Sequence, residues 1–169
     1  MKPRLNPYQA SPATMKAMMD LEGKVAASGL DPTLAELVKI RASQINGCAF
    51  CLDMHTRDAR AKGESEERIY LLNAWRESPL YDDRERAALA WTEAVTLVSQ
   101  GHVPDGVYEQ ARAAFSEEEL VKLTLLVAAI NAWNRFAISF RSVHPIRRAA
   151  SKPSNGTAEA NRSPQAAAT

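Results

Sequence analysis

The chain has 169 residues and a formal net charge of +1. Its length is enough for one domain with its own hydrophobic core, and its near-neutral charge gives no basic patch for binding nucleic acid. No segment has the apolar run of a signal peptide, and the most apolar window, residues 120–130, is shorter than a bilayer-spanning helix. We therefore expect a cytoplasmic protein without nucleic-acid or membrane partners, in a compartment that keeps thiols reduced.

Start and stop signals divide most of the chain into successive helices. Asp31-Pro32 has the form of a helix start, and Asn46-Gly47 has the form of a stop and a turn. Ser116 followed by Glu119 has the form of a capping box, which opens the longest helix. Together with the apolar periodicity, these signals predict helices over residues 13–27, 31–46, 48–62, 65–77, 82–101, 104–115 and 116–141.

No segment alternates as a β-strand does, so the fold class is predicted to be all-α, a single-domain bundle of about seven helices. This domain is expected over residues 1–148 and to begin with an extended arm at residues 1–12, because three prolines there disfavour a helix. Residues 149–169 contain no large apolar side chain and are predicted to be a disordered tail. From Leu125 to Ala132 the last helix is apolar nearly all round, which predicts that it is central or is covered by another chain of a homo-oligomer.

The two cysteines of the chain, Cys48 and Cys51, stand three residues apart at the predicted start of a helix, and His55 follows one turn later. This spacing places the three side chains on one helix face. Leu52 and Ala59 fall on the same stripe, so this face is expected to look inward, into a partly buried pocket. Two thiols this close in a reducing compartment indicate redox chemistry or metal binding.

Two features could activate a thiol here. A helix N-terminus stabilises a thiolate, which favours Cys48, whereas proximity to His55 favours Cys51. A thiolate that attacks a peroxide becomes a sulfenic acid, and a second thiol condenses with it to a disulfide. Because residues three apart in a regular helix are too far apart for a disulfide, the first turn is expected to tighten or unwind. The residues alone leave open which cysteine attacks.

Three stretches carry a family resemblance: Glu36 to Arg41, then Asn46-Gly47-Cys48-x-x-Cys51-x-x-x-His55, and finally Asn131-x-Trp133-Asn134-Arg135. They resemble the alkylhydroperoxidase D family, part of the carboxymuconolactone decarboxylase superfamily. The resemblance implies an all-helical homo-oligomer, often a trimer or hexamer. It also implies a peroxidase that reduces organic hydroperoxides without a cofactor or a metal. A dithiol protein, lipoyl-bearing or thioredoxin-like, would regenerate it.

The resemblance also assigns roles to residues. Cys51 corresponds to the thiol that attacks the peroxide, and Cys48 to the resolving thiol and proton donor. Glu36 and His55 correspond to members of the proton relay. The best-studied branch has a second histidine where this chain has Phe50, so the relay here is shorter. The decarboxylase branch lacks the thiol pair, so lactone decarboxylation is not expected.

Other interpretations compete with the peroxidase. The cysteines could form a redox sensor or an oxidoreductase with little peroxide turnover, or they could be small buried hydrophobic residues. Cys48, Cys51, His55 and Glu36 could also hold zinc in a non-enzymatic helical protein. By periodicity alone Glu36 would be a solvated carboxylate. The remaining polar and aromatic candidates are expected to be core or interface anchors (Trp75, Trp91, Trp133), solvent-facing (His102, His144), or interface or pocket groups (Asn131, Asn134, Arg135).

Overall fold

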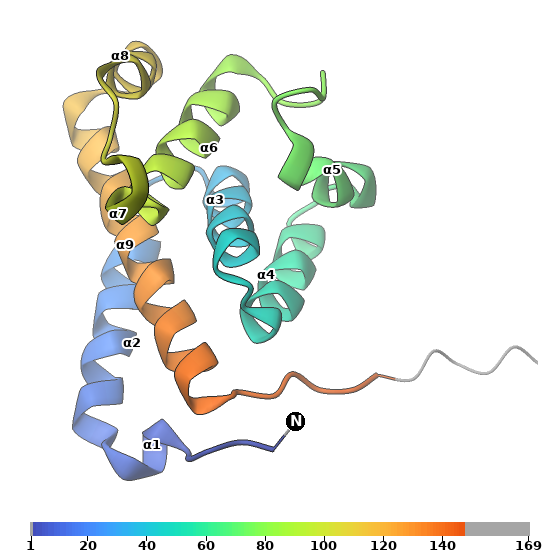
Figure 1. Ribbon diagram of the computed structural model, residues 1–169, viewed down its shortest axis with the longest axis vertical. Helices are drawn as coiled ribbons and strands as arrows, with labels where there is room; N and C mark the ends of the chain where they lie inside the picture. The colour runs from blue at the N-terminus through green and yellow to red at the C-terminus, as the bar shows by residue number, and fades with distance from the viewer. Residues whose placement is uncertain (1, 148–169) are drawn as a thin grey trace, which may run out of the picture.

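The computed structural model describes residues 2–147, and within this range the chain is helical and forms no strand (Figure 1). Nine α-helices and one short 3₁₀ helix follow one another, which confirms the all-α prediction. Their bounds are α1 (Pro7–Ala10), α2 (Pro12–Ala26), α3 (Pro32–Asn46), α4 (Ala49–Ala61), α5 (Glu66–Leu71), η1 (Leu72–Ala74), α6 (Asp83–Thr96), α7 (Val98–Gly101), α8 (Asp105–Ala114) and α9 (Glu117–Phe140).

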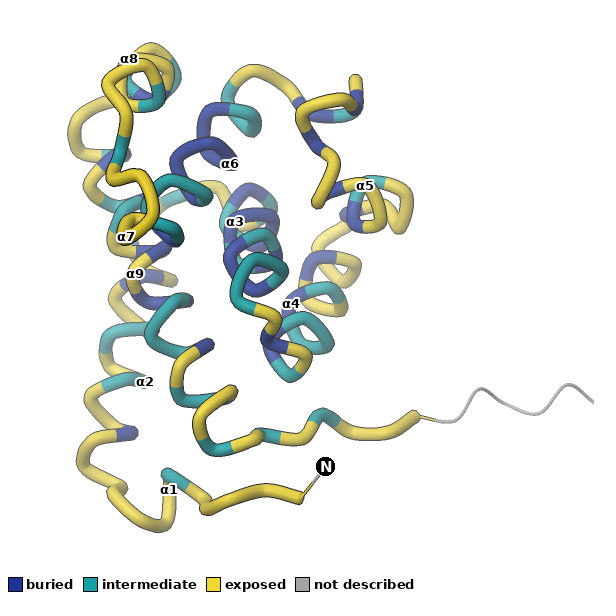
Figure 2. Tube along the Cα trace, in the orientation of Figure 1, coloured by how far each residue is buried: buried dark blue, intermediate teal, exposed yellow. Residues whose placement is uncertain are grey.

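Helix α3 is the centre of the bundle and packs against α4, α6 and α9 (Figure 1). On one side, Val38 belongs to a core shared with α2, α6, α8 and α9. On another side, Leu37 and Ile40 pack with residues of α4, α5, η1 and α6. Figure 2 shows this enclosure, with α3 largely dark while most of α1 and α2 is exposed. Because neighbours cover α3 on several sides, polar residues on this helix are also buried.

The turn between α3 and α4 forms where the sequence predicts it. Gly47 ends α3 with φ of 70°, a left-handed conformation that glycine adopts at little cost. The side-chain amide of Asn46 donates to the side-chain oxygens of Asn131 (3.0 Å) and Asn134 (2.9 Å) on α9. Asn134 is fully buried and in turn donates to Ser43 Oγ. The α9 asparagines therefore hold the turn that carries the cysteines, and they do not line the cavity beside Cys51.

Helix α9 begins with the predicted capping box, in which Ser116 and Glu119 each accept a hydrogen bond from the other's backbone N–H. One face packs on α3, α6 and α2, while Val121 and Leu125 on another face remain 69% and 41% exposed. By length and composition alone, this 24-residue helix could cross a membrane, although the core helix of a folded domain passes the same test. The prediction that another chain of a homo-oligomer covers this exposed apolar face of α9 stays a prediction.

The structure differs from the sequence prediction in three segments. The arm is not fully extended, because Pro7 and Pro12 occupy first-turn positions of α1 and α2, where the fixed φ of proline suits a helix. The helix predicted over residues 82–101 divides at Leu97, whose backbone leaves the helical range. The helix predicted over residues 65–77 tightens into η1 after six residues. The predicted tail, residues 149–169, lies outside the described residues.

We expect Asn134→Ala to lower the free energy of unfolding by about 2–4 kcal/mol, because it opens a small cavity and removes the buried hydrogen bonds that Asn134 makes with Asn46 and Ser43. Denaturant unfolding followed by circular dichroism measures this change. Ser139→Ala, an exposed substitution on the same helix, is the control and should cost less than about 0.5 kcal/mol. Equal losses in the two variants would contradict the role of Asn134 in holding the turn.

Candidate functional site

Cys48 and Cys51 are joined by a disulfide at the start of α4. Cys48 is the N-cap, with an extended backbone (φ −86°, ψ 91°), and only Ala49 begins the helix. The chain therefore opens at its first turn, as the sequence predicts, and the two Cα atoms lie 5.4 Å apart. The backbone N–H of Cys51 points at Cys48 Sγ, with N and S 3.3 Å apart. Both cysteines are buried, and the bond between them shows that they are a pair and not two separate hydrophobic residues.

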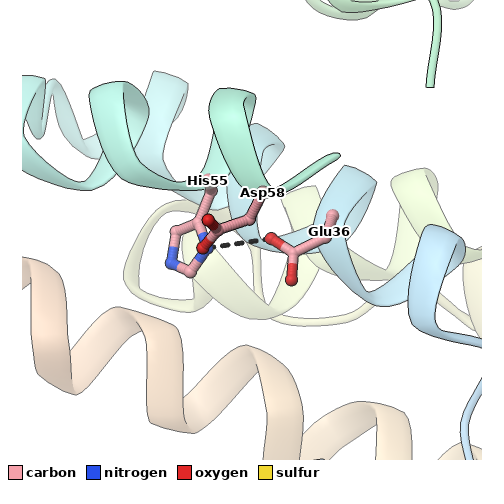
Figure 3. Close-up of side chains that lie close together, drawn as sticks. All are labelled: Glu36, His55 and Asp58. Carbon is pink, nitrogen blue, oxygen red and sulfur yellow. Dashed lines mark hydrogen bonds and ion pairs between the residues drawn. The ribbon is translucent and has the colours of Figure 1, made fainter. Parts of the chain in front are cut away.

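Glu36 on α3 meets His55 on α4 in the interior (Figure 3). The distance from His55 Nδ1 to Glu36 Oε2 is 2.9 Å, and Lys62 Nζ donates to Glu36 Oε1 at 2.6 Å. Glu36 is only 3% exposed, which overturns the interpretation of this residue as a solvated carboxylate. Burial alone would raise the pKa of Glu36, but the hydrogen bonds from His55 and Lys62 outweigh burial and lower its pKa to about 2.

The ionised carboxylate of Glu36 determines which ring nitrogen of His55 carries a proton. Since a carboxylate only accepts hydrogen bonds, the proton between the two groups must lie on His55 Nδ1. This leaves Nε2 of the ring as the atom that can take or give a proton elsewhere. Nε2 belongs to a side chain that lines a cavity together with Cys51.

The cavity that Cys51 and His55 line, here called the Cys51 cavity, has a volume of about 460 Å³. Its wall is mostly apolar, with contributions from α1, α2, α3, α4 and α9. The apolar lining side chains are Pro7, Tyr8, Met15, Met19, Phe50, Met54, Ile130, Trp133, Phe136 and Ala137. The cavity thus offers a mostly apolar space beside Cys51, and its wall also contains the acid–base groups Glu36, His55 and Asp58.

Four charged residues at or beside the Cys51 cavity were not predicted from the sequence: Glu22, Lys39, Asp58 and Lys62. Lys39 Nζ lies 2.9 Å from Glu22 and 3.9 Å from Glu36, so it bridges the two carboxylates. Lys62 binds Glu36 from the end of α4. Helical spacing could have indicated both lysines, because Lys39 follows Glu36 by three residues and Lys62 follows His55 by seven.

The placement of the tryptophans is confirmed only in part. Trp75 and Trp91 are buried in the core, as expected. Trp133 instead lines the Cys51 cavity, and its indole N–H donates to Glu22 at 3.1 Å. Its prediction as a core or interface anchor is therefore wrong, because an apolar helix facing a cavity presents the same pattern as one facing a core.

The predicted four-residue zinc set is not assembled, because both sulfur atoms are bonded to each other. Asp58 instead joins Glu36 and His55, with one ligand-type atom of each within 4.8 Å of the others (Figure 3). Glu36 already holds the ammonium group of Lys62, which repels a second cation. The arrangement suits proton handling better than metal binding.

Known proteins resemble this chain in sequence and in fold. Residues 12–94 match the model of the carboxymuconolactone decarboxylase family. The uncharacterized protein YdfG of Bacillus subtilis is 47% identical over 152 residues, which are 90% of this chain and all of YdfG. A solved structure of protein ATU0492 of Agrobacterium tumefaciens, of unknown function, superposes with a TM-score of 0.85 at 51% identity, over 86% of this chain and all of that one. The alkyl hydroperoxide reductase AhpD of Solibacter usitatus is 38% identical over 62 residues, 37% of this chain and 32% of that protein.

The lowered pKa of Glu36 predicts how stability depends on pH. A carboxyl group whose pKa falls on folding stabilises the protein above its unfolded value, and this contribution is lost as the pH falls through the folded value. For Glu36 the loss should occur between about pH 4.5 and pH 2 and amount to about 3 kcal/mol. Glu36→Gln should therefore be less stable than the parent at pH 7, and the gap should narrow across that range.

Denaturant unfolding at a series of pH values tests this prediction. Glu118→Gln, which removes an exposed carboxylate, is the control and should cost less than about 0.5 kcal/mol at pH 7. A gap between parent and Glu36→Gln that stays constant from pH 7 to pH 2 would refute the ionised, paired state of Glu36.

Proposed function

This chain is a member of the carboxymuconolactone decarboxylase family, of its alkylhydroperoxidase D-like type, and on that premise we propose that it is a thiol peroxidase that reduces organic hydroperoxides. One observation supports this activity above the others. Cys51 belongs to a bonded cysteine pair and shares an apolar cavity with His55, whose ring is held by an ionised carboxylate. The cavity gives a hydroperoxide room to bind, and the cysteine pair, once reduced to two thiols, can supply the two electrons that reduce it.

In the first step, the thiolate of Cys51 attacks the outer oxygen of the hydroperoxide. The O–O bond breaks, Cys51 becomes a sulfenic acid, and the leaving alkoxide takes a proton to become an alcohol. His55 can move this proton through Nε2, because Nδ1 is engaged with Glu36. Cys51 is assigned the attack because it shares the cavity with His55, while Cys48 does not line that cavity.

In the second step, the thiolate of Cys48 attacks the sulfenic sulfur of Cys51. A disulfide forms and hydroxide leaves, which becomes water on protonation. The start of α4 suits this role, since the Cys51 N–H that points at Cys48 Sγ would stabilise negative charge on that sulfur. The bonded pair then corresponds to the oxidised end of the cycle.

Glu36 and His55 have different duties in this proposal. With its pKa near 2, Glu36 stays ionised at neutral pH and does not carry a proton in the cycle. It is a positioning residue that holds the imidazole and its tautomer. His55 is the proton carrier, so the relay proposed here contains one moving group beside the cysteines.

The substrate and the reductant follow from the same features. The mostly apolar wall, with Phe50 in it, suits a hydroperoxide with an alkyl or aryl group. Turnover requires a dithiol, lipoyl-bearing or thioredoxin-like, that returns both cysteines to thiols in a reducing cytoplasm. A redox sensor would use the same disulfide, but it would have no need for a substrate-sized cavity beside the attacking sulfur.

The assignment of Cys51 predicts where the sulfenic acid forms. In Cys48→Ser, one equivalent of cumene hydroperoxide should leave a sulfenic acid on Cys51, which dimedone traps and mass spectrometry locates. In Cys51→Ser, the rate of peroxide consumption should fall at least about a hundredfold, because the remaining thiol does not line the Cys51 cavity. A dimedone adduct on Cys48 that forms as fast as that on Cys51 would reverse the assignment.

The role of His55 predicts a loss of rate without a loss of the cysteine pair. His55→Asn should slow the reaction of the reduced protein with cumene hydroperoxide by about 10²–10⁴-fold, the usual contribution of acid–base catalysis. Stopped-flow measurement across pH 5–9 should also show a flatter rate profile than the parent. His102→Asn changes an exposed histidine and is the matched control, for which the parent rate and profile are expected. If both variants react alike, His55 does not carry the proton.

A further inference from the structure

The two cysteines of the disulfide line different spaces. Cys51 lines the Cys51 cavity and Cys48 does not. Cys48 lines a second space of about 470 Å³, here called the Cys48 hollow, between the start of α4 and the end of α9. Phe50 and Ala137 border both spaces and so form part of the wall between them. The disulfide therefore bridges two compartments that a ligand could enter separately.

Two arginines give the Cys48 hollow a positive rim. Arg4 is held on the end of α9, where its backbone N–H donates to the Phe140 carbonyl (3.0 Å) and its guanidinium to the Ser139 carbonyl (2.9 Å). Arg141 is exposed at the C-terminal cap of α9. Within residues 2–147 neither arginine takes part in an ion pair, although both line the hollow. The Cys51 cavity differs, because its lysine is paired with carboxylates.

We propose that the reductant enters through the Cys48 hollow, attacks Cys48 Sγ, and is a thiol compound that carries negative charge near its thiol. This inference rests on the proposed peroxidase cycle and adds to it a second entrance. The hydroperoxide would use the Cys51 cavity and the reductant the Cys48 hollow, so the two substrates do not compete for one space. Arg4 and Arg141 would attract the negative reductant and orient it.

The reductive half-reaction can be written with all atoms and electrons. A thiolate of the dithiol bonds to Cys48 Sγ, the Cys48–Cys51 bond breaks, and its electron pair goes to Cys51 Sγ, which takes a proton from His55 or water in the Cys51 cavity. The second thiol of the reductant then attacks the mixed disulfide and releases Cys48 as a thiolate, which also takes a proton. The reductant leaves as a disulfide, and both cysteines are thiols again.

Leaving-group chemistry opposes this order in the first step and assists it in the second. The N–H of Cys51 at Cys48 Sγ would make Cys48 the better leaving group, which by itself favours attack on Cys51 in the first step. Access to the sulfur also governs the choice, and the positive hollow at Cys48 favours a negative thiol there. In the second step Cys48 is the group released, and there the helix start assists its departure.

Mass spectrometry can identify the attacked sulfur directly. The disulfide is formed with diamide, so the test does not need peroxidase activity, and the oxidised protein is exposed briefly to glutathione, an acidic monothiol. N-ethylmaleimide in an acid quench then caps the released thiol. Trypsin leaves both cysteines in one peptide, residues 42–57, and fragmentation places each adduct. Glutathione on Cys48 with maleimide on Cys51 is expected; the reverse pattern, or an even mixture, would overturn the proposal.

Blocking each space in turn tests the separate entrances. Ala49 lines only the Cys48 hollow, and Met19 lines only the Cys51 cavity. Ala49→Trp should slow reduction of the diamide-formed disulfide by dihydrolipoate about tenfold or more, whereas Met19→Trp should leave that rate within about twofold. Tyr70→Trp, on exposed α5, controls for the added ring. A slowed reduction in Met19→Trp together with an unchanged one in Ala49→Trp would show entry from the peroxide side.

The charge of the rim has its own readout. Dihydrolipoate and dihydrolipoamide share their dithiol and differ by one carboxylate. The parent should reduce faster with dihydrolipoate, and Arg141→Gln should lower the ratio of the two rates by about two- to fivefold, as expected for one partly solvated charge pair. If Arg141→Gln leaves this ratio unchanged, the positive charge beside the Cys48 hollow does not select the reductant.

Discussion

The hydrogen bond between His55 Nδ1 and the buried carboxylate of Glu36 is the interaction on which the site depends. An isolated carboxylate in a protein interior is strongly unfavourable, so its presence requires partners. His55 lies on α4 and Lys62 caps the C-terminal end of α4, and the two side chains supply these partners to a residue of α3. The same contacts join two helices, keep Glu36 ionised and direct the free nitrogen of the imidazole away from α3. The hydrogen bonds of Glu36 with His55 and Lys62 therefore both stabilise the fold and orient the imidazole for proton transfer.

The turn that precedes α4 sets the second constraint. Asparagines of α9 hold the end of α3, and Gly47 allows the chain to reverse before the cysteines. Cys48 consequently stands outside the helix while Cys51 stands inside it. Because the backbone leaves the helix at Cys48, the two cysteines are close enough to form a disulfide, and each of them lines a different space. A regular helix through both cysteines would have placed them on one face, in one environment and too far apart to bond.

Much of the fold was predictable from local signals, because caps and turn residues act within a few positions of the chain. Asp31, Gly47 and the Ser116 capping box all mark helix ends where predicted. Glu36 shows the limit of periodicity. A single apolar stripe describes a helix with one covered face, whereas neighbours enclose α3 on several sides, so Glu36 is buried away from its stripe. Only the family resemblance indicated its role.

The sequence predicts the reactive residues of the candidate site, but it does not predict most of the residues that surround them. The spacing of Cys48, Cys51 and His55 is local, so the sequence could place them together. Glu22 and Trp133 reach the site through tertiary packing, and no pattern of adjacent residues reports such contacts. The division of the two sulfurs between separate spaces depends likewise on the end of α9, which lies far along the chain from the cysteines.

The most direct test of the account is a titration of the fully reduced protein with cumene hydroperoxide under anaerobic conditions, in which free thiols and cumyl alcohol are counted together. The account predicts that each equivalent of hydroperoxide consumes two thiols and yields one equivalent of alcohol, ending at the Cys48–Cys51 disulfide. Unchanged thiols after addition of excess hydroperoxide would contradict it.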